Sequence, residues 1–208
     1  MHQVFSSRAE GFIQMEGKYP DWFSITAKPN FERFLIPLAG QDNLTFLQLG
    51  AYTGDASVWM LEKVLTGKNS HLNDVDTWQG SDEEAHESIS FNEVYEYYLK
   101  RTSHLSIDKL NSYRSTTTEY LITASNCPSI YDFIYIDADH TTVGVLLDAE
   151  LSWPLLKSGG IMAFDDYTWG SHLPPHLAPK LGINLFIERH QGQFETLAVN
   201  GQVWIRKL

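Results

Sequence analysis

Four aspartates follow two apolar runs of strand length, at the points where those runs end. Asp137 and Asp139 follow the first run, and Asp165 and Asp166 follow the second. Carboxyl ends of neighbouring parallel strands meet at one edge of a sheet, so these side chains are expected to lie together. Two unit charges about 4 Å apart repel by about 4 kcal/mol at an effective dielectric constant of 20. The spacing therefore predicts a cation or a shared proton, and oxygen ligands favour Mg²⁺, Ca²⁺ or Mn²⁺ over zinc. The alternative is a polar turn in which one aspartate is a cap.

His140 adjoins these carboxylates. An imidazole is the usual proton carrier near neutral pH, which favours a catalytic role. A histidine with a structural role is the alternative.

A second candidate site is the segment from Gly50 to Gly54, which follows the run 44–49 and precedes a helical pattern. Small residues there let the backbone approach a ligand, and the helix N-terminus offers free N–H groups. A tight turn without a ligand is the alternative. The third glycine of the nicotinamide fingerprint is missing, which favours a nucleoside such as adenosine. Asp76 ends the next strand, where an acidic side chain can accept ribose hydroxyls; a turn aspartate is the alternative.

To bring these candidate residues together, the chain must form a sheet with helices on both faces. Apolar runs alternate with helical patterns, which predicts βα units and a mainly parallel sheet. The strands are expected at 44–49, 71–76, 110–113, 131–136, 161–164, 194–199 and 203–206. The helices are expected at 55–65, 91–101, 117–124, 142–156 and from the loop 171–179 to residue 190.

Three local features refine this arrangement. Asn200-Gly201 predicts a closing antiparallel hairpin whose two turn residues have positive φ. The segment 157–160 predicts a turn before the strand 161–164. In the helix 142–156, the apolar stripe is expected to be Val143, Leu146, Leu147, Leu151 and Leu155.

Length and composition indicate one domain spanning residues 1–208, with 1–42 as an N-terminal cap and 79–104 as a helical insertion over the site. The net charge of −11 disfavours nucleic acid as a partner. The sequence contains no run of about 18 apolar residues, so no membrane span is predicted. The first residues do not resemble a signal peptide. Together with a single cysteine, Cys127, these features favour the cytoplasm.

Aromatic residues gather in both flanking segments. Tyr19, Trp22 and Phe23 suit either the cover of a pocket or contact with a second subunit, so a homo-oligomer is an open alternative. In the insertion, the aromatic side chains suit an acceptor pocket or core packing equally; they are Phe91, Tyr95, Tyr97 and Tyr98.

Four segments in register resemble the class I S-adenosylmethionine-dependent methyltransferases: 46–54, 76–80, 131–140 and 159–167. The sequence is most similar to the small bacterial group that includes the macrocin-type sugar O-methyltransferases. The resemblance covers residue 43 to the C-terminus. It implies a doubly wound, mainly parallel, seven-stranded α/β sheet with a C-terminal antiparallel hairpin.

The resemblance also implies roles for individual residues. Gly50, Tyr52 and Gly54 would hold the methionine part of the cofactor, Asp76 the ribose and 115–117 the adenine side. Asp137, Asp165 and Asp166 would bind Mg²⁺ or another hard divalent cation, and Asp139 or His140 would be the base. The full cofactor set is Gln48, Gly50, Ala51, Tyr52, Gly54, Asp76, Thr77, Trp78, Ser115, Thr116 and Asp137.

One departure from the family pattern concerns Gln48, which stands where the family commonly has an acidic residue at the end of the first strand. It weakens the expected contact with the amino group of the cofactor. The segment 115–117 is also less acidic than is usual.

The expected reaction is methyl transfer to a hydroxyl of a sugar or another small molecule, assisted by the cation, with Asp139 or His140 removing the proton. Two rivals are open. One is a hydroxylase or nucleotide-dependent oxidoreductase on a similar fold, and the other is a non-catalytic protein that binds the cofactor or assists assembly.

Overall fold

The computed structural model describes residues 19–80, 90–105 and 108–208. Parts of the predicted cap and insertion, residues 1–18 and 81–89, lie outside this range. Seven strands form one sheet: β1 Thr45–Leu49, β2 His71–Asp76, β3 Leu110–Arg114, β4 Tyr131–Ile136, β5 Leu156–Phe164, β6 Phe194–Val199 and β7 Val203–Lys207. Their spatial order is β3-β2-β1-β4-β5-β7-β6.

The first five strands are parallel, and β7 pairs antiparallel with both β5 and β6. The predicted fold class, a doubly wound sheet with a C-terminal hairpin, is therefore confirmed. The helices are α1 Lys28–Leu35, α2 Asp55–Lys63, α3 Phe91–Thr102, α4 Thr117–Ala124, α5 Thr142–Ser152 and α6 Pro179–Arg189. Short turns of other helix types are η1 Phe23–Ala27, η2 Ile36–Leu38, η4 Trp153–Leu155 and η5 Pro175–Leu177.

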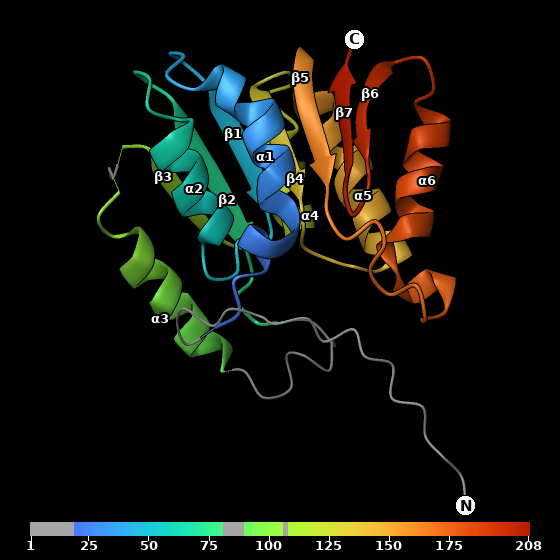
Figure 1. The fold of residues 1–208 in the computed structure, drawn as a ribbon, viewed down its shortest axis with the longest axis horizontal. Coiled ribbons are helices and arrows are strands. Elements are labelled where there is room, and N and C mark those ends of the chain that lie inside the picture. The colour runs from blue at the N-terminus through green and yellow to red at the C-terminus, as the bar shows by residue number, and fades with distance from the viewer. Residues whose placement is uncertain (1–18, 81–89, 106–107) are drawn as a thin grey trace, which may run out of the picture.

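The helices form two layers with the sheet between them (Figure 1). Helices α1 and α2 cover one face, and α4, α5 and α6 cover the other. Helix α3 lies beyond the sheet, at the end where the parallel strands finish. None of the helices in the described ranges is long and apolar enough to cross a membrane.

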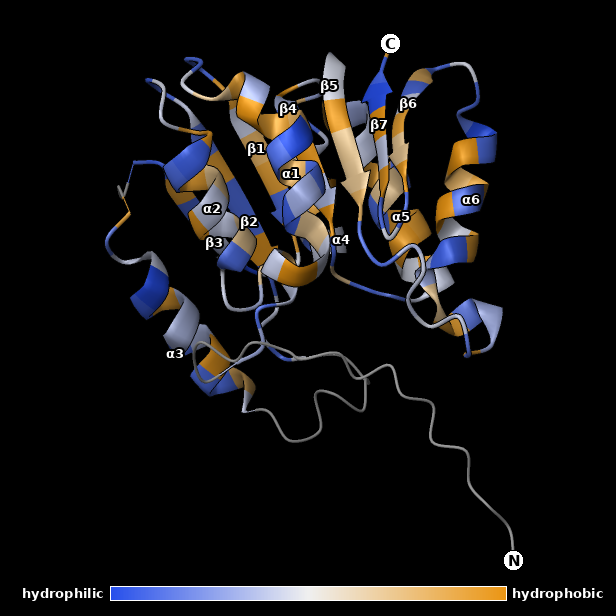
Figure 2. Ribbon diagram, viewed as in Figure 1, coloured by the Kyte–Doolittle hydropathy of each residue, from blue (hydrophilic) through white to orange (hydrophobic). Residues whose placement is uncertain are grey.

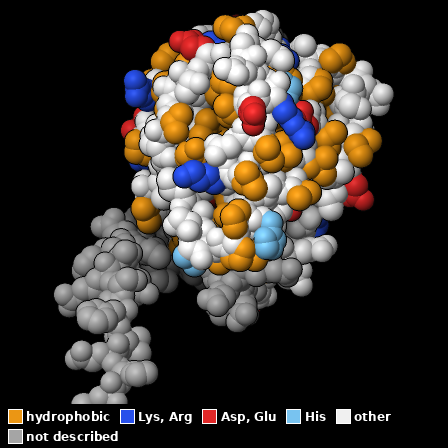
Figure 3. All heavy atoms as spheres, turned by 90° about the vertical axis from the view of Figure 1, so that its right-hand side faces the viewer, with side chains coloured by type: hydrophobic (Ala, Val, Ile, Leu, Met, Phe, Trp, Pro, Cys, Tyr) orange, Lys and Arg blue, Asp and Glu red, His pale blue; other side chains and the backbone are white. Residues whose placement is uncertain are grey.

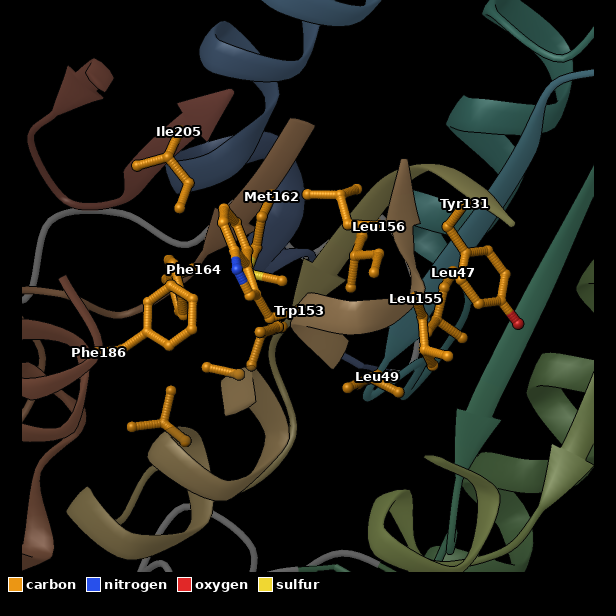
Figure 4. Packing of buried hydrophobic residues seen from close by; sticks show 14 of the residues in the cluster. Leu47, Leu49, Tyr131, Trp153, Leu155, Leu156, Met162, Phe164, Phe186 and Ile205 are labelled. Carbon is orange, nitrogen blue, oxygen red and sulfur yellow. The ribbon is translucent and has the colours of Figure 1, made fainter. Parts of the chain in front are cut away.

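The core lies on both sides of the central strands, whose apolar residues form the middle of the molecule (Figure 2). Strands buried on both faces read as continuous apolar runs, which is why β4 was recognisable from the sequence. Figure 4 shows one side of the core, where Trp153 lies near Phe186. Their ring centroids are 5.5 Å apart in an edge-to-face arrangement.

The segment 157–160, predicted as a turn, belongs to β5 instead. Tyr131 is aligned with Leu156 but Phe133 with Ile161, so the extra residues form an irregularity within the strand. Gly159 has a φ of +79° there. Glycine signals a bulge as well as a turn, which explains the wrong boundary.

The apolar stripe predicted for α5 is confirmed in part: Leu155 is buried, and Leu146 and Leu151 pack against the core. Val143 and Leu147 are exposed, while Val145 and Ala149 are buried against the sheet. A Cβ at Gly182 of α6 would lie 2.3 Å from the carbonyl oxygen of Thr142. The close approach of α6 turns a face of smaller residues inward, which the count of apolar residues could not show.

The closing hairpin is present, but neither Asn200 nor Gly201 has a positive φ. The connection has three residues, and the Asn200 side chain accepts a hydrogen bond from the Gln202 backbone N–H at 2.9 Å. A side-chain acceptor therefore replaces the tight two-residue turn that was predicted.

Candidate functional site

The glycine turn after β1 requires glycine at both of its ends. Gly50 has a φ of +87° and Gly54 a φ of +81°. A Cβ at position 50 would lie 1.9 Å from the Asp137 carbonyl oxygen, and a Cβ at position 54 would lie 2.9 Å from the Tyr98 ring. The turn is thus pressed against the end of β4 on one side and against α3 on the other.

Asp76, at the end of β2, turns its carboxylate toward this same turn. Oδ2 accepts hydrogen bonds from the N–H groups of Ala51 and Tyr52, at 2.8 and 2.9 Å. Oδ1 accepts one from the Trp78 N–H at 2.6 Å. One carboxylate therefore joins two neighbouring strand ends. It could accept a hydrogen bond from a ribose hydroxyl only while it keeps these three bonds.

Gln48 is buried beneath the turn. Its side-chain nitrogen donates to the Gly50 carbonyl oxygen at 2.8 Å, and its side-chain oxygen accepts from the Ser57 hydroxyl at 3.2 Å. An acidic residue at this position could not donate to that carbonyl. The departure from the family pattern therefore has a local role, which is to hold the carbonyl of Gly50.

Aromatic side chains cover the turn. The indole N–H of Trp78 donates to the Tyr52 carbonyl oxygen at 2.9 Å, and the Trp78 ring is buried. Tyr19 and Trp22 lie against the Tyr52 ring, with centroids 6.2 and 5.1 Å away. Of the predicted cap, Tyr19 and Trp22 therefore lie on the glycine turn, while α1 packs on the sheet.

The remaining predicted cofactor residues lie in nearby loops. The Thr77 hydroxyl accepts from the Gln79 N–H at 3.2 Å. Thr116 is the N-cap of α4, accepting from the Glu119 N–H at 3.2 Å, and the Ser115 hydroxyl donates to its carbonyl oxygen. Thr116 is exposed and Ser115 half-buried, so a ligand can reach this side.

At the ends of β4 and β5, Asp137, His140 and Asp166 converge, each offering a ligand atom within 4.8 Å of the others. His140 Nε2 is 3.1 Å from Asp166 Oδ2 and 3.6 Å from Asp137 Oδ1. Burial raises the pKa of Asp137 to about 8, and the charge of Asp165 adds to this, while the His140 hydrogen bond opposes it. The cluster brings two carboxyl groups and an imidazole together, and these donor groups suit a divalent cation.

The other two aspartates of the predicted group are directed elsewhere. Asp165 is buried, accepting hydrogen bonds from the Tyr135 hydroxyl and the Asp166 N–H. Asp139 is exposed and accepts from the Thr141 N–H at 2.8 Å, at the start of α5. Of the two candidate bases, the structure brings only His140 to the cluster.

Three further residues near the site were not singled out as functional from the sequence. Asp74 is buried in β2 and accepts from the Tyr98 hydroxyl at 2.8 Å. The Trp169 ring lies 5.1 Å from the His140 ring, and Tyr135 holds Asp165. A carboxylate inside a strand, at Asp74, was a signal that could have been noticed.

Comparison with known proteins gives the family of this chain. The family model described as a methyltransferase domain matches residues 47–167, which include both the glycine turn and the carboxylate cluster. The chain therefore belongs to this family, and it is an S-adenosylmethionine-dependent methyltransferase. The resemblance stated from the sequence is confirmed. A search of curated proteins gives no match.

Solved structures show the same fold at low sequence identity. An O-methyltransferase from Bacillus cereus, in complex with SAH, is 16% identical with a TM-score of 0.57, over 86% of this chain and 81% of that one. MycE from the mycinamycin biosynthetic pathway, in complex with Mg and SAH, is 15% identical with a TM-score of 0.59. That alignment covers 89% of this chain but 49% of MycE. A candidate rRNA-methylase from Clostridium thermocellum is 14% identical with a TM-score of 0.64, over 88% and 96%.

Proposed function

We propose that this methyltransferase transfers the methyl group to a hydroxyl oxygen of a sugar or another small molecule, with help from a divalent cation. The convergence of Asp137, His140 and Asp166 beside the glycine turn carries the proposal. The close approach of Gly50 to the end of β4 supports it, because a cofactor whose methionine part lies at the turn would lie next to this cluster. The net charge of −11 makes a nucleic acid a poor acceptor.

Each region of the site has its own task. The turn 50–54 receives the methionine part of the cofactor, the end of β2 the ribose, and the N-terminus of α4 the adenine side. S-adenosylmethionine supplies an activated methyl group. A divalent cation, when bound, lowers the pKa of a hydroxyl next to it.

Asp137 and Asp166 are the proposed cation ligands because their carboxylates are half-buried and face each other across His140. Asp165 was the third predicted ligand, and both of its oxygens accept hydrogen bonds within the chain. It adds negative charge to the cluster. The imidazole of His140 is the proposed acceptor for the hydroxyl proton, and the two neighbouring carboxylates stabilise the charge that the ring acquires.

The test is transfer of a labelled methyl group from S-adenosylmethionine to a panel of sugars and phenols, with Mg²⁺ or after exhaustive chelation by EDTA. We expect product only with the cation. An undiminished rate after chelation would disprove the role of the cation. Binding of the cofactor without turnover across the panel would favour a non-catalytic protein.

A further inference from the structure

A chain of buried polar groups runs from α3 to the glycine turn. It begins at the Tyr98 hydroxyl, which donates to Asp74 Oδ2 at 2.8 Å, and both side chains are fully buried. The Ser57 hydroxyl donates its one proton to Gln48 Oε1 at 3.2 Å, and it lies next to the buried carboxyl group of Asp74. Gln48 then donates to the Gly50 carbonyl oxygen at 2.8 Å. Four side chains thus connect a helix outside the sheet with one peptide group of the turn.

Helix α3 contacts the same turn at further points. The Tyr98 ring packs against Gly54, where a Cβ would lie 2.9 Å from it, and against Trp78, with centroids 4.7 Å apart. Arg101 forms an ion pair with Asp55 at the first residue of α2. The helix is therefore docked on the turn along its length, and the polar chain is the buried part of that contact.

The chemistry of this chain is unusual for a packing contact. Burial raises the pKa of Asp74 to about 7, against the opposing interactions with Ser57 and Tyr98. An apolar pair of similar volume would fill the same space without burying an ionisable group. What a buried hydrogen-bonded network adds is a defined orientation of its members. The member at the end of this chain is the carbonyl of Gly50.

We propose that Tyr98 and Asp74 are positioning residues for the cofactor: through Ser57 and Gln48 they hold the Gly50 carbonyl, and with it the turn, in the conformation that receives the methionine part. This inference rests on the proposed role of the turn. It extends the site to helix α3, which lies beyond the sheet.

The experiment compares Tyr98→Phe with Tyr131→Phe in the full chain. Tyr131 is also a buried phenol, and it bonds with the side chain of Asn73, which precedes Asp74 in β2. Both variants lose one buried hydroxyl contact to the same strand, but only Tyr98 is linked to the turn. Calorimetric titration with S-adenosylhomocysteine is expected to show about fivefold weaker binding for Tyr98→Phe and a change within about twofold for Tyr131→Phe. Hydrogen exchange of residues 48–58 without ligand is expected to be faster only in Tyr98→Phe.

The Asp74 variants test the same link from the other side. Asn keeps an oxygen that accepts from Tyr98, so Asp74→Asn is expected to bind the ligand within about twofold of the wild type. Asp74→Ala removes the acceptor and is expected to resemble Tyr98→Phe. Equal affinity and equal exchange in all variants would overturn this inference alone. If the wild type failed to bind S-adenosylhomocysteine, the proposed function would be overturned and this inference with it.

Discussion

At the ends of β1 and β2, the polar groups of the glycine turn have partners, whereas at the ends of β4 and β5 ionisable groups converge. Asp76 accepts three backbone hydrogen bonds, and Gln48 makes two. By contrast, Asp137 and Asp166 lie together around His140, and burial and neighbouring charge raise the pKa of Asp137 to about 8. The first region is built to keep its shape. The second buries ionisable groups next to one another at a cost in stability, which is typical of a site that acts on a ligand.

The largest effect is expected from breaking the first region with Gly50→Ala. The new Cβ would meet the Asp137 carbonyl at 1.9 Å, and the φ of +87° disfavours any side chain. We expect no measurable binding of S-adenosylhomocysteine and a loss of more than about 4 kcal/mol in the free energy of unfolding, measured by urea denaturation. Gly192→Ala is the control, because Gly192 has a φ of +83° but open space around it. It should lose only about 1–2 kcal/mol. Equal losses would show that the contact with β4 is unimportant.

In the second region, His140→Gln is expected to lower kcat about 10²–10⁴-fold, because the ring is the proposed proton acceptor. Affinity for S-adenosylhomocysteine should stay within about twofold, since the glycine turn is untouched. His190→Gln is the matched control: His190 also contacts a carboxylate, Glu150, at 3.0 Å, but lies at the end of α6. If the rate of His140→Gln equalled that of the control, a group other than His140 would remove the proton of the acceptor hydroxyl.

Asp74 provides a smaller effect, which depends on pH. Its pKa is about 7 in the folded protein, above the value of 3.8 for an exposed aspartate. Its contribution to stability is therefore full below about pH 4 and is lost as the pH rises through 7. The free energy of unfolding should fall from this cause by up to about 1.4 kcal/mol per pH unit within that window. Asp74→Asn should make the slope in denaturation curves from about pH 4 to 8 shallower without removing it, because the raised pKa of Asp137 contributes in the same range. An unchanged slope would contradict the assignment.

The smallest effect is expected at Trp169, whose ring lies against His140. An aromatic contact is worth about 0.5–1.5 kcal/mol, so Trp169→Leu should lower kcat about 2–10-fold. Trp169→Phe keeps an aromatic ring and should recover most of the rate in the same assay. A loss beyond 100-fold would mean that Trp169 touches the acceptor and does more than position His140.

The sequence predicted the strands and their order along the chain well, most clearly for β4 and the end of β5, because residues 133–136 and 161–164 are apolar runs bounded by polar or glycine residues. It also predicted which segments meet at the carboxyl edge, since that follows from the parallel topology. It did not predict that Asp165 turns inward to Tyr135, or that Asp139 belongs to the start of α5. Side-chain direction after a strand depends on the loop backbone, which spacing does not encode.

The contact between α3 and the glycine turn was beyond the sequence for a different reason. Tyr98 and Asp74 are far apart in the chain, and either residue alone suits packing or a site.

Figure 3 shows the side of the molecule with α6, where η5 and α6 expose Leu177 and Leu181. A homo-oligomer stays a prediction, as does the cytoplasmic location.

The measurement that tests the central claim most directly is a titration of Mn²⁺ into the metal-free full chain, with the free ion followed by electron paramagnetic resonance. Mn²⁺ takes the oxygen ligands that Mg²⁺ prefers. The account predicts that the wild type binds about one equivalent and that Asp166→Asn, which removes one carboxylate from the cluster, binds far more weakly. Failure of the wild type to bind, or equal binding by Asp166→Asn, would contradict a cation site at the ends of β4 and β5.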